Sequence, residues 1–184
     1  TMELKFKRLE DGAVLPIRGT KGAAGIDLTC IKIDTVINEA NQLMLVYHTG
    51  LAVEIPAGYV GLLIPRSSIW KKSLWLTDNV GVIYSDYRGE ILAVMKATTD
   101  AIPAVYQKGE RFCQLVIVPV PEYEITEVSE LTPTERGDGG FGSTGTDNEN
   151  ECSAATGTQS QLKEQVESAP EPAAAQESAE VSEG

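Results

Sequence analysis

The chain could bind an anion at residues 65–68, where Pro-Arg-Ser-Ser stands between two patterned stretches. An apolar run at 59–64 precedes this segment, and residues 67–76 follow it with apolar side chains at near-helical spacing. Backbone N–H groups at a helix start, two hydroxyls and the Arg66 guanidinium would together bind phosphate. The alternative is structural, with Ser67 serving only as the cap of that helix. The segment alone supports both interpretations.

A second candidate is the glycine-rich segment 136–145, which holds a guanidinium, an aromatic ring and two hydroxyls. Its glycines match GxGxxG, but a dinucleotide-binding turn follows a strand and opens a helix. This segment instead follows a proline-containing stretch at 131–135, which excludes that interpretation. We predict an arm that closes over a polyphosphate and stacks on a base. A plain linker would not explain why Arg136 and Phe141 lie among the glycines.

Residues 81–90 place turn-forming residues between two apolar segments, which predicts a hairpin with Ser85 and Asp86 near its tip. The main chain of a hairpin can bond the edge of a base as a neighbouring strand would, and Tyr87 could pack against a sugar. The alternative is an ordinary surface hairpin.

Four single residues complete the candidates. Asp27 is the one carboxylate of a buried-looking turn at 23–28, and Gln114 stands among apolar residues of the last long strand. Gln114 either satisfies backbone groups or points into a site. Cys113 is predicted to be a small core residue rather than a nucleophile, because no histidine lies nearby in sequence. His48, the single histidine, is predicted to be a turn residue and would be the only possible centre of a Ser-His-Asp triad.

The elements that must position these groups are strands. Residues 2–7 alternate between polar and apolar, as in a strand with one wet face. Apolar runs rich in Val, Ile and Leu follow at 43–47, 51–55, 59–64, 91–97 and 112–120. Many short strands without amphipathic helices between them predict an all-β sandwich, barrel or jelly roll rather than a parallel α/β sheet. Only 67–76 is predicted to be a short helix.

Composition narrows the function classes. The 184 residues are 42% hydrophobic but only 6% aromatic, so the core must be mostly aliphatic, and the net charge is −12. Such a charge argues against binding nucleic acid or an anionic membrane surface. Three cysteines, far apart, argue against a disulfide scaffold or a thiolate zinc site. With no apolar run of membrane-spanning length and no signal peptide, we expect a cytoplasmic protein.

Residues 146–184 form an acidic tail with nine carboxylates against one lysine. The rest of the tail is mostly Ala, Ser, Gln and Pro, and Leu162, Val166 and Val181 are its only large aliphatic residues, so it cannot bury enough apolar area to offset its ordering entropy. We predict that it is disordered, with a short helix at 159–167 as the only structured alternative. Its expected role is a solvating extension, and recruitment of a protein partner is a lesser alternative.

Taken in order, these segments resemble the five motifs of the trimeric dUTP diphosphatase (dUTPase) family. The matching segments are 24–28, 65–68, 81–90, 109–114 and 136–145, and the resemblance covers residues 2–145. It implies a jelly-roll homotrimer with active sites at the subunit interfaces. The predicted organisation is a β core at 1–135, a mobile closing arm at 136–145 and the tail at 146–184. Within that family, the sequence resembles the bacterial and phage members.

The resemblance also implies hydrolysis of dUTP to dUMP and pyrophosphate with Mg²⁺, which the triphosphate and waters hold without a direct protein ligand. The hairpin from Asp78 to Leu92 would bind uracil through its main chain, and Tyr87 would pack on deoxyribose. Asp27 would support the phosphate and metal region. The remaining residues implied at the site contact base or phosphates: Arg66, Ser67, Ser68, Asn79, Val82, Ile83, Gln114, Arg136, Phe141, Gly142, Ser143 and Thr144.

Three positions depart from the family pattern. Ser68 stands where glycine is commoner and Asp78 where asparagine is common; both changes are expected to be mild. Tyr84 stands where the family has the aspartate that activates the attacking water, and a phenol is a poor base at neutral pH. We therefore expect slowed hydrolysis. The alternative is a catalytically impaired nucleotide-binding or regulatory protein, whereas a capsid-like jelly roll leaves the glycine-rich arm unexplained.

Overall fold

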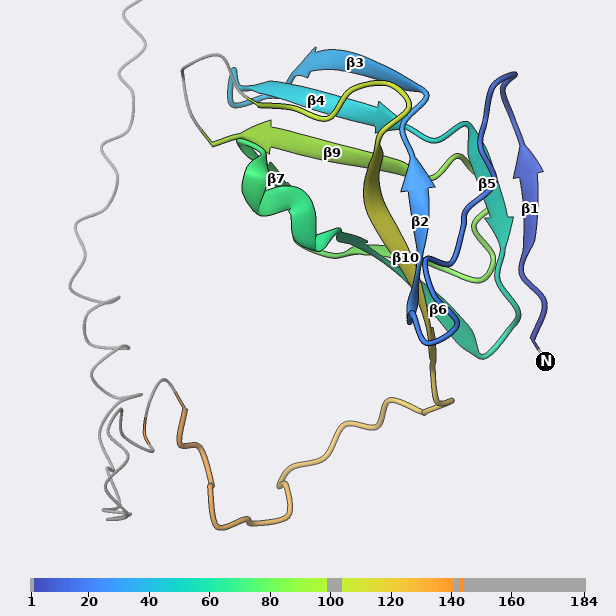
Figure 1. The fold of residues 1–184 in the computed structure, drawn as a ribbon. Coiled ribbons are helices and arrows are strands. Elements are labelled where there is room, and N and C mark those ends of the chain that lie inside the picture. Colours follow the sequence, from blue (N-terminus) through green and yellow to red (C-terminus); the bar gives the residue numbers. More distant parts are fainter. Residues whose placement is uncertain (1, 99–103, 141–142, 144–184) are drawn as a thin grey trace, which may run out of the picture. The chain divides into compact units, whose positions relative to one another are not determined.

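The computed structural model describes residues 2–98, 104–140 and 143, and divides the chain into the units Thr1–Glu124 and Ile125–Gly184. Every helix and strand of the described residues lies in the first unit (Figure 1). The elements are β1 (Lys5–Arg8), β2 (Gly25–Thr29), β3 (Lys32–Ile37), β4 (Leu43–His48), β5 (Leu51–Glu54), β6 (Tyr59–Pro65), the 3₁₀ helix η1 (Ser67–Lys71), β7 (Leu74–Leu76), β8 (Gly81–Ile83), β9 (Leu92–Ala97) and β10 (Arg111–Pro119).

The strands form two four-stranded antiparallel sheets and one short pair. One sheet has the order β2-β10-β6-β8, the other β3-β4-β9-β7, and β1 pairs with β5. Figure 1 shows β3, β4 and β9 side by side, apart from the group of β2, β10 and β6. Consecutive strands often belong to different sheets, as in a jelly roll. The predicted all-β jelly-roll class is confirmed.

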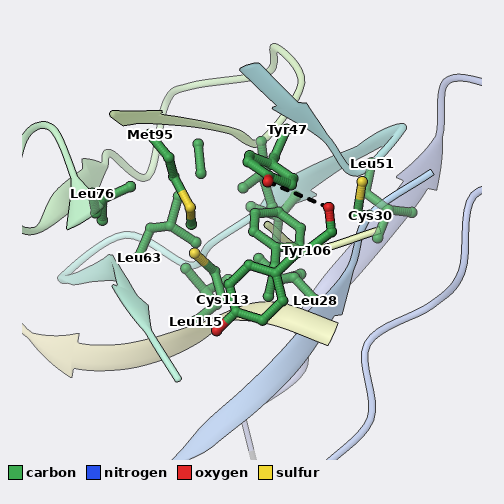
Figure 2. Packing of buried hydrophobic residues seen from close by; sticks show 14 of the residues in the cluster. Leu28, Cys30, Tyr47, Leu51, Leu63, Leu76, Met95, Tyr106, Cys113 and Leu115 are labelled. Carbon is green, nitrogen blue, oxygen red and sulfur yellow. Dashed lines mark hydrogen bonds between the residues drawn. The ribbon is translucent and has the colours of Figure 1, made fainter. Parts of the chain in front are cut away.

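A single hydrophobic core joins the two sheets. Leu28, Leu63 and Leu115 come from one sheet, and Tyr47 and Met95 from the other; all five are at most 2% exposed. Three aromatic residues pack together here, since the Tyr47 ring stacks on Phe112 at 5.3 Å and meets the edge of Tyr106 at 6.3 Å. The Tyr47 hydroxyl donates to the Tyr106 carbonyl, 3.4 Å away (Figure 2). A mostly aliphatic composition is thus completed by one aromatic cluster.

Strand β10 contains a bulge at its start. Arg111 lies opposite Thr29 of β2, but Cys113 lies opposite Leu28, so two steps on β10 match one step on β2. The inserted residue is Phe112, and both Phe112 and Cys113 are fully buried. Such a bulge shifts the alternation of the strand and re-aims the side chains before it. The expected core role of Cys113 agrees with its burial.

The predicted hairpin at 81–90 is wrong. Strand β8 pairs with β6, whereas β9 pairs with β4 and β7 in the other sheet, so residues 84–91 cross between sheets. An apolar pattern marks strands but does not name their partners. The Tyr84 carbonyl accepts from Tyr87 N in a local turn directly after β8.

Two further local expectations change. The predicted helix over 67–76 is only the one-turn η1, after which β7 alternates buried Leu74 and Leu76 with Trp75, which is 50% exposed. The helical and strand periods overlap in so short a segment. His48, expected in a turn, is the last residue of β4 and pairs with Lys32 and Leu92 on the flanking strands.

The second unit is described only at 125–140 and 143. These residues contain no helix or strand, and short turns join Gly137 N to the Thr134 carbonyl and Gly139 N to the Arg136 carbonyl. Gly137 has a φ of +54°, which glycine adopts at little cost. The tail prediction for 146–184, including the helix at 159–167, lies outside the described residues. No helix in the described part of the chain is long and apolar enough to cross a membrane.

Candidate active site

An ion-pair cluster forms around Asp27, at the middle of β2. Arg66 Nε donates to its Oδ1 at 3.0 Å and an Arg111 terminal nitrogen donates to its Oδ2 at 2.8 Å. Arg66 also donates to the Arg111 carbonyl at 3.3 Å. Two guanidinium groups thus share one carboxylate, which leaves a local excess of one positive charge. Asp27 is 14% exposed, Arg66 27% and Arg111 43%, so the arginines are the groups that solvent or a ligand can reach.

Strand register explains why these residues meet. Gln114 on β10 lies opposite Asp27 on β2 and opposite Ile64 on β6, and Arg66 follows directly after β6. In regular alternation Arg111 would point to the side opposite Gln114. The bulge at Phe112 returns Arg111 to the Asp27 side, where it makes its ion pair. An inserted core residue therefore builds the charged cluster.

Gln114 satisfies a backbone group, one of the two roles open to it. Its Nε2 donates to the Pro65 carbonyl at 3.2 Å, next to Arg66. Gly25 leaves room for this amide: a Cβ there would lie 3.1 Å from Gln114 Cδ and closer still to Oε1. The Gln114 side chain is consequently fixed at the edge of the arginine cluster.

The hydroxyls at 67 and 68 lie on η1. Its N-cap residue is Arg66, and no side-chain cap bond is present in this described helix, so the interpretation of Ser67 as merely a cap is wrong. Ser67 is exposed, while Ser68 lies 3.4 Å from the hydroxyl of Tyr106. Neither serine side chain therefore caps the helix, and both residues directly follow Arg66 in the chain.

Lys72, which directly follows η1, is engaged in contacts with the loop before β10. Its Nζ donates to Glu110 at 3.2 Å and to the Val105 carbonyl at 3.1 Å, and it lies 4.7 Å from the Tyr106 ring centre. The Gln107 N–H bond, with Lys72 adding to it, lowers the pKa of Glu110. This pair holds the loop before β10 against η1.

In the predicted base-binding segment, the Tyr87 ring is held by local contacts. Its hydroxyl donates to the Glu90 carbonyl at 3.0 Å, and a Cβ at Gly89 would collide with the ring. The ring is 42% exposed, and Tyr84 is 65% exposed. A ring held at both its hydroxyl and its face, yet open to solvent, is suited to stacking on a flat partner.

The other predicted base-binding residues flank this segment. Asp78 and Asn79 form the turn after β7, with Asn79 at a φ of +57°. Val82 and Ile83 lie on β8, and Leu92 begins β9. Gly81 is buried against Leu63 of β6, which fixes β8 at the sheet edge.

Within one chain, the arginine cluster around Asp27 lies far from the predicted base-binding segment. Ile83 lies opposite Gly61 near the start of β6, and Tyr84 follows beyond it, whereas Arg66 follows the other end. At 3.3 Å per residue, the five residues from Gly61 to Arg66 span on the order of 17 Å. The structure thus joins Asp27, Arg66, Arg111 and Gln114 but does not join them to Tyr84 and Tyr87.

The predicted arm is described in part. Arg136 is exposed, and Ser143 N donates to the Gly140 carbonyl in a turn. Phe141, Gly142 and Thr144 lie outside the described residues, so their predicted roles stay predictions.

Sequence reasoning missed two residues of the site. Arg111 lies within the motif at 109–114, but regular alternation along the strand predicts that it faces away from Gln114 and Asp27. Tyr106, which contacts Ser68, follows a segment without a strand pattern. A basic residue directly before two apolar residues, Phe112 and Cys113, is the only sequence signal for Arg111.

Fold and site define an all-β protein with a guanidinium cluster on one sheet and an exposed tyrosine ring in the segment that crosses from that sheet to the other. A family model of dUTPases matches residues 11–145. The chain is 43% identical over 145 residues to the deoxyuridine 5'-triphosphate nucleotidohydrolase of Hydrogenobaculum, covering 78% of this chain and 99% of that protein. It is 37% identical over 142 residues to that of Paramecium bursaria Chlorella virus 1, covering 77% and 97%.

Solved structures agree. A mutant dUTPase of Staphylococcus bacteriophage 80alpha, with dUpNHpp, superimposes with a TM-score of 0.68 at 31% identity over 79% of this chain and 100% of that one. A mutant dUTPase from phage phi11 gives 0.59 at 28% identity over 70% and 98%. The chain belongs to the dUTPase family, as the motifs predicted.

Proposed function

We propose that this protein hydrolyses dUTP to dUMP and pyrophosphate, and that subunits of a homotrimer share its sites. The observation that carries the proposal is the pair of guanidinium groups on Asp27, flanked by Gln114 and two serine hydroxyls. Relatives named as deoxyuridine triphosphate nucleotidohydrolases and a phage dUTPase seen with dUpNHpp support the substrate.

The arginine cluster around Asp27 forms the phosphate-binding part of the proposed site, where it neutralises and orients the triphosphate. Arg66 and Arg111 keep donors beyond those given to Asp27, since a guanidinium has five. Ser67, Ser68 and the Gln114 amide add neutral donors around them. In the reaction, water adds to the α-phosphorus, the bond to the α–β bridging oxygen breaks, and pyrophosphate leaves with that electron pair. Charge that develops on the leaving group is stabilised by prepositioned guanidinium groups.

The base half selects deoxyuridine. Main-chain groups between Asp78 and Leu92 bond the uracil edge, with Asn79, Val82 and Ile83 among them. The Tyr87 ring, held by the Glu90 carbonyl, packs on the sugar and excludes a 2′-hydroxyl. Arg136, Ser143 and Thr144 of the arm reach the γ-phosphate, and Phe141 stacks on uracil.

Mg²⁺ fits this site as an ion that the triphosphate and waters hold. Both Asp27 oxygens accept from guanidinium groups, so Asp27 suits the outer sphere rather than direct ligation. When bound, the ion supplies charge neutralisation on the triphosphate. A related phage dUTPase structure is described as showing a structural Mg(II) ion.

The separation along β6 supports shared sites. The arginine cluster and the segment that carries Tyr87 follow from opposite ends of β6, which spans on the order of 17 Å from Gly61 to Arg66, so one bound nucleotide is better served by the cluster of one subunit and the Tyr87 of another. Rotational symmetry brings one subunit's cluster to its neighbour's base-binding segment. A homotrimer is the assembly that the family pattern implies.

Tyr84 sets the rate. A phenol is protonated at neutral pH and cannot accept the proton of the attacking water, so turnover falls while binding persists. The second candidate function, a catalytically impaired nucleotide-binding or regulatory protein, is favoured by this one residue.

The test compares pyrophosphate release from dUTP in the parent chain, Tyr84→Asp and Tyr84→Phe under the same Mg²⁺. A positioned general base contributes about 10²–10⁴-fold, so Tyr84→Asp should raise kcat at least about 100-fold. Tyr84→Phe, which keeps the ring, should leave kcat near the parent value. Parent turnover that Tyr84→Asp cannot exceed would show that another group activates the water, and dUpNHpp binding without turnover in either chain would favour the second function.

A further inference from the structure

His48 has a carboxylate on each ring nitrogen. Its Nδ1 lies 3.1 Å from Glu90 Oε2, and its Nε2 lies 3.1 Å from Asp34 Oδ2. The His48 and Glu90 side chains are 15% and 18% exposed, and the residues come from β4 and from the segment before β9. No side chain of this cluster takes part in the proposed mechanism, in which Glu90 acts only through its backbone carbonyl.

A third carboxylate approaches the same point. Donor atoms of Glu10, His48 and Glu90 all lie within 4.8 Å of one another. Gly50 organises this approach: its N–H donates to Glu90 Oε1 at 2.7 Å, and its carbonyl accepts from Leu9 N at 2.8 Å. A Cβ on Gly50 would meet the Glu10 Cβ at 3.4 Å, and the residue has a φ of +64°. One glycine therefore fixes Glu90 and leaves room for Glu10.

The charges around this cluster are unbalanced. Lys32 donates to Asp34 at 2.7 Å, and this bond lowers the pKa of Asp34 and raises that of Lys32. Glu10 and Glu90 add to the raised pKa of Lys32 by their field alone. Among the described residues, no lysine or arginine nitrogen lies within ion-pair distance of the Glu10 or Glu90 carboxylate. The Glu10 and Glu90 carboxylates thus lie near the His48 ring without an ion pair to a lysine or arginine of the described residues.

We propose that His48 Nδ1, Glu90 Oε2 and a Glu10 oxygen form a binding site for a divalent first-row metal of the Zn²⁺ class. Ligand bonds of about 2.1 Å and a ligand separation of 3.1 Å give an angle of about 95° at the metal, which N/O sites allow. Water completes the coordination. One imidazole with two carboxylates suits Zn²⁺ or Mn²⁺ better than Ca²⁺, whose sites use oxygen alone.

Asp34 supplies the supporting contact. A metal-ligating histidine usually donates its other N–H to a carboxylate, which fixes the tautomer and ring orientation. Asp34 Oδ2 lies where it accepts from His48 Nε2, and Lys32 holds it there. The competing explanation is an imidazolium that donates to both Glu90 and Asp34 and binds no metal.

A bound metal would join distant parts of the chain. Glu10 lies in the turn after β1, His48 ends β4, and the Glu90 carbonyl accepts from the Tyr87 hydroxyl. The site would therefore brace the segment that carries Tyr87 against the β-sheet core.

The test is calorimetric titration of ZnCl₂ into the metal-free full chain without nucleotide. A Cys152→Ser background removes a thiol that lies outside the described residues. We expect one site per chain that His48→Gln and Glu90→Gln abolish and that Glu10→Gln weakens at least tenfold. Asp34→Asn should weaken it about 10- to 100-fold, the usual effect of a lost supporting carboxylate. The matched control is Glu39→Gln, an exposed carboxylate in the 38–42 turn.

Each outcome decides the proposal. Zinc binding that disappears with His48→Gln and stays with Glu39→Gln supports it. Absence of saturable binding up to about 1 mM Zn²⁺, or binding unchanged in His48→Gln, overturns it in favour of the imidazolium bridge. If His48→Gln or Glu90→Gln fails to fold, Glu10→Gln decides, because its exposed side chain makes its loss tolerable. Unchanged zinc affinity in Glu10→Gln then overturns the proposed ligand set.

Discussion

Replacement of Arg111 by alanine should separate binding from stability. Its ion pair with Asp27 is short, at 2.8 Å, but its side chain is 43% exposed. Pairs with such exposure contribute up to about 1 kcal/mol, and Asp27 keeps its bond from Arg66. We therefore expect Arg111→Ala to lower the free energy of unfolding by about 1 kcal/mol or less in urea titrations.

The effect on nucleotide binding should be larger. A charge-assisted hydrogen bond is worth about 1.5–3 kcal/mol, which corresponds to about 10- to 150-fold in affinity. Calorimetry with dUpNHpp should show this loss in Arg111→Ala. Arg111→Lys keeps the charge but not the fork and should fall in between. Arg18→Ala, an exposed arginine outside the cluster, is the matched control.

Two results would refute the reasoning. If Arg111→Ala costs about 3 kcal/mol or more of stability, the arginine holds the fold rather than the ligand. If dUpNHpp affinity stays at the parent value while Arg66→Ala abolishes it, the bulge does not serve the site. A double-mutant cycle with Asp27→Asn measures how much the two side chains depend on one another.

Three more predictions follow from buried groups. Gly25→Ala should displace the Gln114 amide and weaken dUpNHpp binding several-fold, with a smaller effect on melting; unchanged affinity would remove Gln114 from the site. Thr49 is fully buried, and its hydroxyl donates to the Ile91 carbonyl at 2.8 Å and accepts from Leu51 N at 3.1 Å. Thr49→Val should therefore lower the free energy of unfolding in urea by about 2–4 kcal/mol, and Thr49→Ser by much less. Burial raises the pKa of Cys30 to about 11 and raises that of Cys113 as well, so iodoacetamide at pH 8 should label both thiols only after denaturation. The rate of Cys30 labelling should rise as the pH approaches 11. Rapid labelling of native Cys30 at pH 8 would contradict its burial.

Much of the fold was predictable because its central strands are apolar. The runs at 43–47, 59–64 and 112–120 correspond to β4, β6 and β10, which lie inside the sheets. Strand β3, by contrast, is an edge strand with a largely exposed Lys32–Ile37 sequence, and its pattern resembles that of a loop. Exposure thus removes the signal on which a strand prediction depends.

Partner choice was not predictable from local pattern. Residues 81–90 contain turn-forming residues between apolar segments, yet β8 and β9 belong to different sheets. They do not pair with each other, because β8 pairs with β6 and β9 with β4. His48 shows the same limit, since its two carboxylates lie 14 residues before it and 42 residues after it in the chain. Contacts of that separation depend on topology, which no single window of sequence contains.

The bulge in β10 makes the length of one segment as important as its composition. The residues of β10 before Phe112 are offset by one position, relative to β2, from the residues after it. The face of the sheet to which odd-numbered and even-numbered side chains point therefore changes at Phe112. Loss or gain of one residue between Gly109 and Gln114 would exchange interior and exterior: it would turn Arg111 toward the core and bring Asp27 a different neighbour. A change of two residues would restore the facing. Substitutions in this motif can therefore be tolerated one at a time, whereas an odd change in its length should not be tolerated.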